Sequence, residues 1–288
     1  LNKIKSNAKL SIINSISDIF SFNGEEIKND FKRMFSVDGF EWRGDVKNLE
    51  EIKNSNVKIG NGAIYIENGA KLNNCILNTT NGPIFIGKDS EIMEGSMIRG
   101  PFAICNNSVI KMGAKIYENT TVGPFCKVGG EINNVVFFGY SSKAHDGFLG
   151  NSIIGEWCNL GADTNNSNLK NNYDNVKIWN YSSESFKQTG LQFCGLIMGD
   201  HSKCGINTMF NTGTVVGVGA NIFGSGFPRN FIPSFSWGGS SGFIVHRIDK
   251  FFKTAELVLA RRNETLSDDD IEILSHVYNM TKSYRNEK

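Results

Sequence analysis

The 288-residue chain has only five prolines, no cysteine pair spaced as CxxC and almost no excess of either charge. Lys and Arg number 30 against 29 for Asp and Glu, so no basic excess predicts a nucleic-acid or membrane partner. No apolar run approaches the roughly 18 residues of a membrane span, and the first ten residues lack the apolar core of a signal peptide. We therefore expect a cytoplasmic protein with reduced cysteines, whose partners are small molecules or other subunits.

Glycine and a six-residue repeat are what the sequence has in abundance. The 31 glycines favour a fold with many tight corners. Ile or Val recurs at every sixth position from Ile86 to Val128, and the fourth residue after these aliphatics is usually small, as at Ser90 and Ser96. A period of six matches neither the 3.6 of a helix nor the 2 of an ordinary strand, so each hexad is a short strand plus a corner. The sequence predicts an all-β fold, a left-handed parallel β-helix with an aliphatic stack inside.

The repeat also indicates the domain organisation. We expect a helical segment over residues 1–55 with a loop around 38–45, the β-helix over 56–226, and an exit loop and two C-terminal helices over 227–288. The second of these helices has Ser267 as its N-cap and acidic residues in its first turn. The terminal helices should cap the open end of the rod, and residues 224–243 form either the exit from the last coil or a lid or subunit contact.

The repeat is interrupted at residues 129–153 and 163–197, and loops between coils are where binding residues are usually carried. His145 lies in the first interruption, between Lys143 and Gly147, and an accessible imidazole is a natural general base for an amine nucleophile. A surface role is the alternative for His145. We expect a structural or subunit-contact role for His201, and packing or solvated roles for His246 and His276.

The second interruption begins with six asparagines within eleven residues, accompanied by Lys170, Tyr173 and Lys177. Such a tract is typical of a solvated loop, because Asn tolerates left-handed corners. It also suits a sugar phosphate, because amides and a phenol bind hydroxyls and a lysine binds phosphate.

These residues resemble the acetyltransferase half of the bifunctional N-acetylglucosamine-1-phosphate uridylyltransferase/glucosamine-1-phosphate acetyltransferase family, in its variant bacterial branch. The motifs that carry the resemblance lie at 142–145, 149–151, 154–155, 159–162 and 172–174, and the similarity runs from about residue 16 to 285. The resemblance implies acetyl-CoA as co-substrate, no metal for acetyl transfer, a homotrimer with a site shared between subunits, and a role in UDP-N-acetylglucosamine biosynthesis.

The same resemblance implies roles for individual residues. His145 takes the position of the catalytic base that deprotonates the amine of the sugar. The substrate-binding positions are Lys127, Lys143, Asn159, Asn172, Tyr173 and Lys177. The positions that line acetyl-CoA are Gly161, Ala162, Ile206 and Gly224.

The sequence departs from the family in three places. One residue is missing before His145, the stretch before Asn172 is longer, and the basic pair upstream of the histidine is replaced by the apolar residues 135–138. Lys127 or Lys143 could take over phosphate recognition. The nucleotide-binding loop of the uridylyltransferase half is not visible, and residues 1 to about 45 resemble only its tail.

Other functions remain open at this point. A non-catalytic trimeric scaffold, or a domain associated with a sugar-phosphate nucleotidyltransferase, would use the same rod. A zinc hydratase similar to the gamma-type carbonic anhydrases would need three histidines to converge, and His145, His201 and His246 lie far apart in the sequence.

Overall fold

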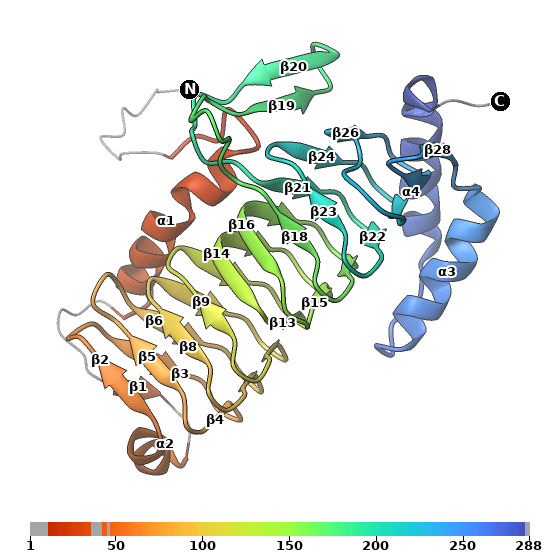
Figure 1. Ribbon diagram of the computed structural model, residues 1–288. Helices are drawn as coiled ribbons and strands as arrows, with labels where there is room; N and C mark the ends of the chain where they lie inside the picture. Colours follow the sequence, from red (N-terminus) through yellow and green to blue (C-terminus); the bar gives the residue numbers. More distant parts are fainter. Residues whose placement is uncertain (1–10, 36–41, 45–46, 286–288) are drawn as a thin grey trace, which may run out of the picture.

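The protein is a triangular rod of stacked coils, with helices near both ends of the chain (Figure 1). The computed structural model describes residues 11–35, 42–44 and 47–285. Neighbouring coils pair their strands in parallel, so the predicted left-handed parallel β-helix is confirmed.

Three faces make up the rod, and each is a ladder of short strands. Face 1 consists of β1 (Trp42–Gly44), β3 (Ile64–Ile66), β6 (Ile84–Ile86), β9 (Phe102–Ile104), β12 (Thr120–Val122), β21 (Leu196–Met198), β24 (Thr214–Val216) and β26 (Phe231–Ile232). Face 2 consists of β4 (Lys71–Leu72), β7 (Glu91–Ile92), β10 (Val109–Ile110), β13 (Lys127–Val128), β15 (Ser142–Lys143), β17 (Asn159–Leu160), β22 (Lys203–Cys204), β25 (Asn221–Ile222) and β27 (Ser236–Gly239).

Face 3 starts with β2 (Val57–Ile59), β5 (Ile76–Asn78), β8 (Met97–Arg99) and β11 (Lys115–Ile116), and ends with β18 (Asn165–Asn166) and β23 (Met209–Phe210). Between them, β14 (Glu131–Phe137) and β16 (Phe148–Ile154) each bend from face 3 into face 1. We call the corner between faces 2 and 3 the 2/3 edge, and name the 3/1 and 1/2 edges in the same way.

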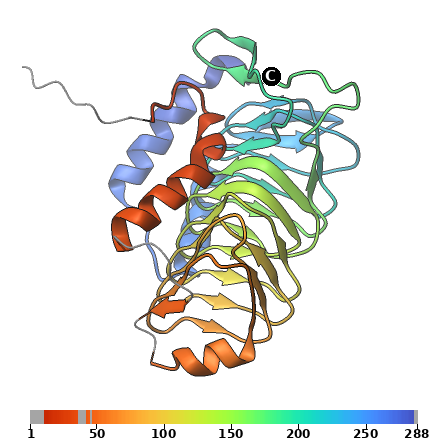
Figure 2. The ribbon, with the colours of Figure 1, turned by 90° about the vertical axis from the view of Figure 1, so that its left-hand side faces the viewer.

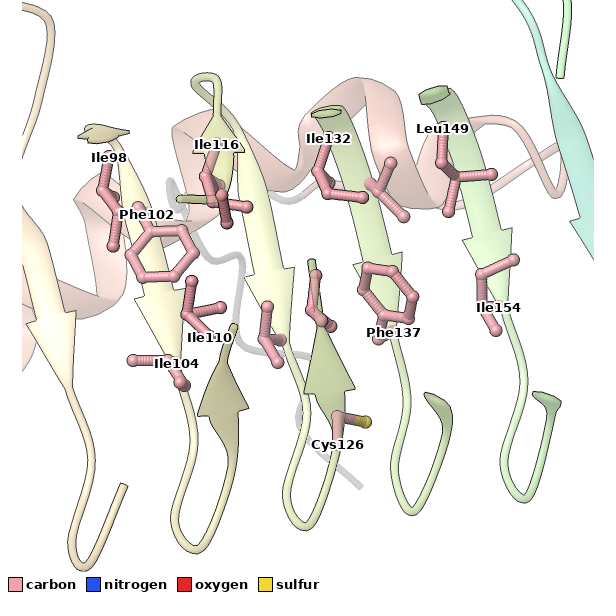
Figure 3. Close-up of a cluster of buried hydrophobic side chains, with 14 of the residues drawn as sticks. Ile98, Phe102, Ile104, Ile110, Ile116, Cys126, Ile132, Phe137, Leu149 and Ile154 are labelled. Atoms are coloured by element: carbon pink, nitrogen blue, oxygen red, sulfur yellow. The ribbon is translucent and has the colours of Figure 1, made fainter. Parts of the chain in front are cut away.

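The repeat forms the core that the sequence predicts. All eight aliphatic residues from Ile86 to Val128 are buried, and several lie one above another along the axis of the rod (Figure 3). The small residues of the repeat are buried as well, and their hydroxyls satisfy corner carbonyls: Ser108 donates to Gly123 O at 2.6 Å and Ser202 to Gly217 O at 2.6 Å. A narrow interior therefore needs a large and a small residue in turn.

The first interruption of the repeat is not a loop, contrary to our expectation. Ile86 pairs with Ile104, eighteen residues on, whereas Val122 pairs with Phe137, only fifteen residues on. This coil is three residues shorter than the coil before it, because β14 is one continuous strand that bends from face 3 into face 1. The hexad phase is lost, but the chain stays in the rod.

The second interruption does leave the rod. After β18 the chain forms a loop and an antiparallel hairpin, β19 (Lys177–Asn180) and β20 (Ser185–Gln188), before it returns at β21. Figure 1 shows this hairpin projecting beyond the coils. Its inner side chains Val176, Ile178 and Trp179 pack on the outer surface of face 1 with Phe20 of α1 (Asp18–Phe35).

Helices lie near both ends of the chain. Those near the C-terminus run along the side of the rod rather than across its open end as expected, because Tyr140 Oη donates to Glu264 between them at 3.2 Å. At the N-terminal end lie β1 and α2 (Leu49–Ser55); β1 lies in the expected loop, whose remaining residues fall mostly outside the described part of the chain. Two predicted C-terminal helices are present, α3 (Ile248–Ala260) and α4 (Asp268–Met280), followed by a short 3₁₀ turn, η1 (Lys282–Tyr284). Ser267 caps α4 and forms a capping box with Asp270, as expected.

Residues 224–243 form more than an exit. β26 pairs with β24 and β27 pairs with β25, so parallel pairing continues to Gly238, past the boundary expected at residue 226. β28 (Gly242–Val245) then pairs with β27 in antiparallel fashion and leads into α3. Figure 2 shows α1 and α4 on the same side of the rod.

Candidate functional site

His145 lies at the 2/3 edge, in the corner that joins β15 to β16. Its side chain is exposed and has no hydrogen bond or ion pair with another side chain among the described residues. The imidazole is therefore presented to solvent rather than held in the core.

The side chain of Lys143 lies inside the rod and forms hydrogen bonds with the backbone of this corner. Its Nζ donates to His145 O at 2.8 Å, to Asp146 O at 3.2 Å and to Gly129 O at 3.4 Å. Only 1% of Lys143 is exposed, and burial lowers the pKa of its ammonium to about 8. The predicted contact between Lys143 and a substrate is wrong in this structure, because the side chain points into the rod.

The sequence carried a signal for this inward orientation. Lys143 pairs with Val128 of the coil below, so it occupies a position of the aliphatic stack. Phe137, Lys143 and Leu149 are also spaced six apart, and Phe137 and Leu149 are buried core residues. The six-residue repeat thus includes Lys143 as an inward-facing position. A search for aliphatic residues alone does not detect it.

The predicted acetyl-CoA residues lie along the same edge as His145. Asp163 N donates to Asp146 O at 3.1 Å and Asn207 N to Ala162 O at 2.8 Å, so His145, Ala162 and Ile206 occupy successive corners. Gly224 follows one corner further, because β25 pairs with β22. Ile206 is 71% exposed, so an apolar side chain stands in solvent beside the line of corner residues. This edge could hold a long, narrow ligand.

Gly161 has a structural explanation. A Cβ at this position would lie 2.5 Å from the backbone carbon of Gly205 in the next coil. The glycine is therefore required for the coils to stack, whatever ligand lies outside.

Lys127 and Asn159 lie on face 2 on either side of Ser142, in neighbouring coils. Both are exposed and close to the strand that leads to His145. The guanidinium of Arg262, followed by partial burial and by Lys111, lowers the pKa of Lys127. Arg262 comes from the turn after α3, and no pattern in the sequence indicates that this positive charge belongs to the same surface.

The asparagine tract divides into two parts. Asn165, Asn166 and Asn168 stabilise the coil: Asn165 Oδ1 accepts from Phe148 N at 2.7 Å, Asn166 Oδ1 from Gly150 N at 2.8 Å, and Asn168 donates to Asn151 Oδ1 at 2.8 Å. Asn172 and Tyr173 are exposed instead. The sequence suggests a single polar tract, but its first part makes hydrogen bonds within the rod and its second part lies in the loop outside the rod.

The loop that carries Asn172, Tyr173 and Lys177 leaves the rod at the 3/1 edge, after β18. Asn172 contacts Asp174 at 2.6 Å, and Gln192 Nε2 donates to Tyr173 O at 2.9 Å. His145 lies at the other edge of face 3. The chain thus places the candidate base and the predicted sugar-binding residues on opposite sides of one face, and does not bring them together by itself.

Two of the other three histidines are buried in the part of the rod near α3. His201 is 9% exposed and stacks on Trp157, with ring centroids 6.3 Å apart, and burial lowers its pKa to about 4. His246 Nδ1 lies 3.0 Å from Gly219 O. His276 is exposed on α4. Within the described residues no three His, Cys, Asp or Glu side chains converge in a group that could hold a metal ion.

A large, mainly apolar cavity lies elsewhere on the rod. It has a volume of about 770 Å³, lies on face 1 between α1 and α4, and is lined mainly by aliphatic side chains such as Ile19, Ile153 and Val215. None of the predicted site residues lines it, and its lining includes neither a histidine nor a basic side chain. We therefore place the candidate site at the 2/3 edge rather than in this cavity.

The chain was compared with known proteins. It is 33% identical to the bifunctional protein GlmU of Methanococcus aeolicus over 117 residues, which is 39% of this chain and 26% of that protein. It is 31% identical to the bifunctional protein GlmU of Wigglesworthia glossinidia brevipalpis over 166 residues, 58% of this chain and 30% of that protein. The chain is similar to bifunctional GlmU proteins. The resemblance expected from the motifs is thereby confirmed, and the chain spans between a quarter and a third of the length of these relatives.

No protein family model matches the chain. Among solved structures, the polySia-specific acetyltransferase NeuO has a TM-score of 0.36 at 16% identity, over 67% of this chain and 87% of that one. The Arabidopsis UDP-N-acetylglucosamine acyltransferase has a TM-score of 0.26 at 15% identity, over 81% of this chain and 91% of that one. Likenesses this weak say nothing about function. No helix among the described residues has the length and apolar character needed to cross a membrane.

Proposed function

We propose that this protein is an acetyl-CoA-dependent N-acetyltransferase of the hexapeptide-repeat class that acts on an amino-sugar phosphate, most simply glucosamine 1-phosphate. The observation that carries the proposal is the exposed imidazole of His145 at the head of an edge that continues through Ala162, Ile206 and Gly224. The similarity to GlmU proteins supports the same activity.

In the proposed reaction His145 accepts a proton from the neutral amine of the sugar as the nitrogen attacks the thioester carbonyl. The new C–N bond forms, the C–S bond breaks, and the imidazolium of His145 returns the proton to the CoA thiolate, which leaves as a thiol. The acetyl arm of acetyl-CoA would lie along the 2/3 edge, beside the exposed side chain of Ile206.

Lys127, with the positive charge of Arg262 nearby, is suited to the phosphate of the acceptor, and Asn159 to its hydroxyls. Asn172, Tyr173 and Lys177 lie at the other edge of face 3 and would complete the site from a neighbouring copy. We therefore propose that the active form is a homotrimer in which adjacent rods meet beside this face.

The direct test measures CoA release with glucosamine 1-phosphate as acceptor. His145→Ala should lower kcat by about 10²–10⁴, because it removes a general base. His276→Ala is the matched control, since His276 is also exposed but lies on α4, and its activity should equal that of the wild type. Equal activity of His145→Ala and wild type would exclude His145 as the base.

A protein that binds acetyl-CoA to no measurable extent and acetylates no amino-sugar phosphate would instead be a non-catalytic scaffold. Sedimentation equilibrium measures the oligomeric state independently of the activity. A trimer that transfers no acetyl group would support the scaffold function, and an active monomer would exclude a site shared between subunits.

A further inference from the structure

The apolar cavity on face 1 is not used by the proposed reaction. Its volume of about 770 Å³ falls within the range of small-molecule sites, roughly 300–1,000 Å³. Ile153 of β16, Ile197 of β21 and Val215 of β24 are paired across neighbouring coils and form one wall. Side chains of α1, α4 and η1 contribute to the other walls, and Figure 2 shows both α1 and α4 on this side of the rod. Segments far apart in the chain thus enclose one apolar space.

Three of the lining side chains are large, apolar and still exposed. Ile16 is 44% exposed, Phe138 47% and Met280 63%, and they come from three separate segments. Apolar side chains gathered at the opening of a cavity are typical of a surface that a ligand covers. The apolar part of a ligand would remove them from water.

One end of the cavity is acidic. Glu156 and Asp200 line it, and they lie at the 1/2 edge in neighbouring coils, just after β16 and β21. Asp200 Oδ1 accepts from Glu156 N at 2.8 Å, so the two residues are held close together. Among the described residues neither carboxylate forms an ion pair, and no basic side chain lines the cavity. The cavity is therefore apolar over face 1 and negatively charged at the 1/2 edge.

The surroundings of Glu156 disfavour its negative charge. Partial burial, followed by the charges of Asp200 and Asp270, raises the pKa of Glu156. A cation close to Glu156 would offset these effects, because an opposite charge stabilises the ionised carboxylate. The acidic end of the cavity therefore favours a positively charged group over a neutral or a negative one.

The substrates of the proposed reaction do not match this charge. CoA and an amino-sugar phosphate both carry phosphate groups, which two adjacent carboxylates repel. The cavity is also separate from the candidate base, because His145 lies at the 2/3 edge and the cavity lies between face 1 and the 1/2 edge. A ligand of a different chemical class is needed to fill it.

We propose that this cavity binds an amphiphilic amine, in which a primary ammonium group is joined to an aliphatic chain. The ammonium group would donate charge-assisted hydrogen bonds to the carboxylates of Glu156 and Asp200. The aliphatic chain would lie over Ile153, Ile197 and Val215 and would be covered by α4. An alkyl sulfate offers the same chain with the opposite charge, and is excluded by the two carboxylates.

The test titrates the full chain with octylamine at pH 7, where the amine is protonated, and follows binding by calorimetry. Octylamine should bind saturably. Decylamine should bind about tenfold more tightly or better, because each methylene that leaves water strengthens binding by about three- to fourfold. Octyl sulfate should not bind, since it matches octylamine in its chain and differs in the sign of its charge.

The variants separate the two ends of the cavity. Glu156→Gln should weaken octylamine binding by about tenfold or more, because it removes the charge of an acceptor and keeps the size of the side chain. Glu272→Gln is the matched control, since Glu272 is exposed on α4 and does not line the cavity. Val277→Trp adds volume to a lining residue of α4 and should abolish binding. Glu156 is exposed, so Glu156→Gln should fold, which circular dichroism checks.

Three results overturn the proposal: no saturable binding of octylamine, equal binding of octyl sulfate, or equal affinities of the wild type and Glu156→Gln. Saturating CoA should leave the affinity for octylamine unchanged, and competition between the two would also overturn it. The measurement does not depend on acetyl transfer. A protein that binds octylamine and transfers no acetyl group would keep this site and lose the proposed reaction, and an active enzyme that binds no octylamine would do the reverse.

Discussion

Replacing Lys143 by methionine removes a buried ammonium beneath the corner that carries His145. The side chain donates to His145 O, Asp146 O and Gly129 O. Asp146 O also accepts from Asp163 N, so the carbonyls of His145 and Gly129 are the ones that depend most on the ammonium. The substitution therefore changes both the stability of the rod and the geometry of the candidate base.

At pH 7 two effects oppose each other. A buried carbonyl that loses its donor costs about 1–3 kcal/mol, so the two carbonyls together cost several kcal/mol. Burial of the charge lowers the pKa of Lys143 from 10.5 to about 8, which corresponds to about 3 kcal/mol in favour of the neutral amine. Because these contributions are similar in size, the stability of the variant at one pH is a poor test.

The pH dependence separates them. Between pH 8 and 10.5 the folded protein has lost the Lys143 proton while the unfolded chain retains it, so the unfolded state binds more protons and stability rises with pH. The contribution is small below pH 8 and amounts to about 1 kcal/mol between pH 7 and pH 9. Methionine does not titrate, so the free energy of unfolding of the wild type relative to Lys143→Met should increase by this amount.

The assay is urea unfolding of both proteins at pH 7, 8 and 9, with the difference in free energy compared at each pH. Lys143→Gln is a second variant, because its amide can donate to the carbonyls without a charge. Glutamine does not titrate, so the wild type should show the same pH-dependent increase in stability relative to Lys143→Gln as relative to Lys143→Met. We expect Lys143→Gln to keep more of kcat than Lys143→Met, since a misplaced catalytic group can cost up to about 10²-fold in rate. Differences that stay constant from pH 7 to 9 would refute the buried, pKa-shifted lysine.

Three further predictions follow from other parts of the structure. Ser267→Ala should destabilise the protein by about 1 kcal/mol, because it removes the cap of α4; an unchanged urea midpoint would contradict this. Ile206→Ala should raise KM for acetyl-CoA severalfold with little change in kcat, and an effect on the amino sugar instead would move the acetyl-CoA site. Burial raises the pKa of Cys126, Cys158 and Cys194 to about 12, so iodoacetamide at pH 8 should label these thiols only after unfolding.

The sequence determined the fold through its period. An Ile or Val at every sixth position fits a short strand followed by a corner, and fits neither a helix nor a long strand. The buried stack from Ile86 to Val128 follows from this period. The capping box at Ser267 was equally readable, because it depends on residues three positions apart. Both features depend on residues close together in the chain, so their spacing can be recognised in the sequence.

The tertiary structure decided which side of each strand faces the solvent and which distant segments meet. The shortened coil at β14 shifted the register, so Lys143 became a core residue while His145 remained outside. Arg262 approaches Lys127 across 135 residues, and Asp200 lies beside Glu156 only because their coils stack. Such charges are brought together by packing between segments far apart in the chain, and no spacing in the sequence indicates them.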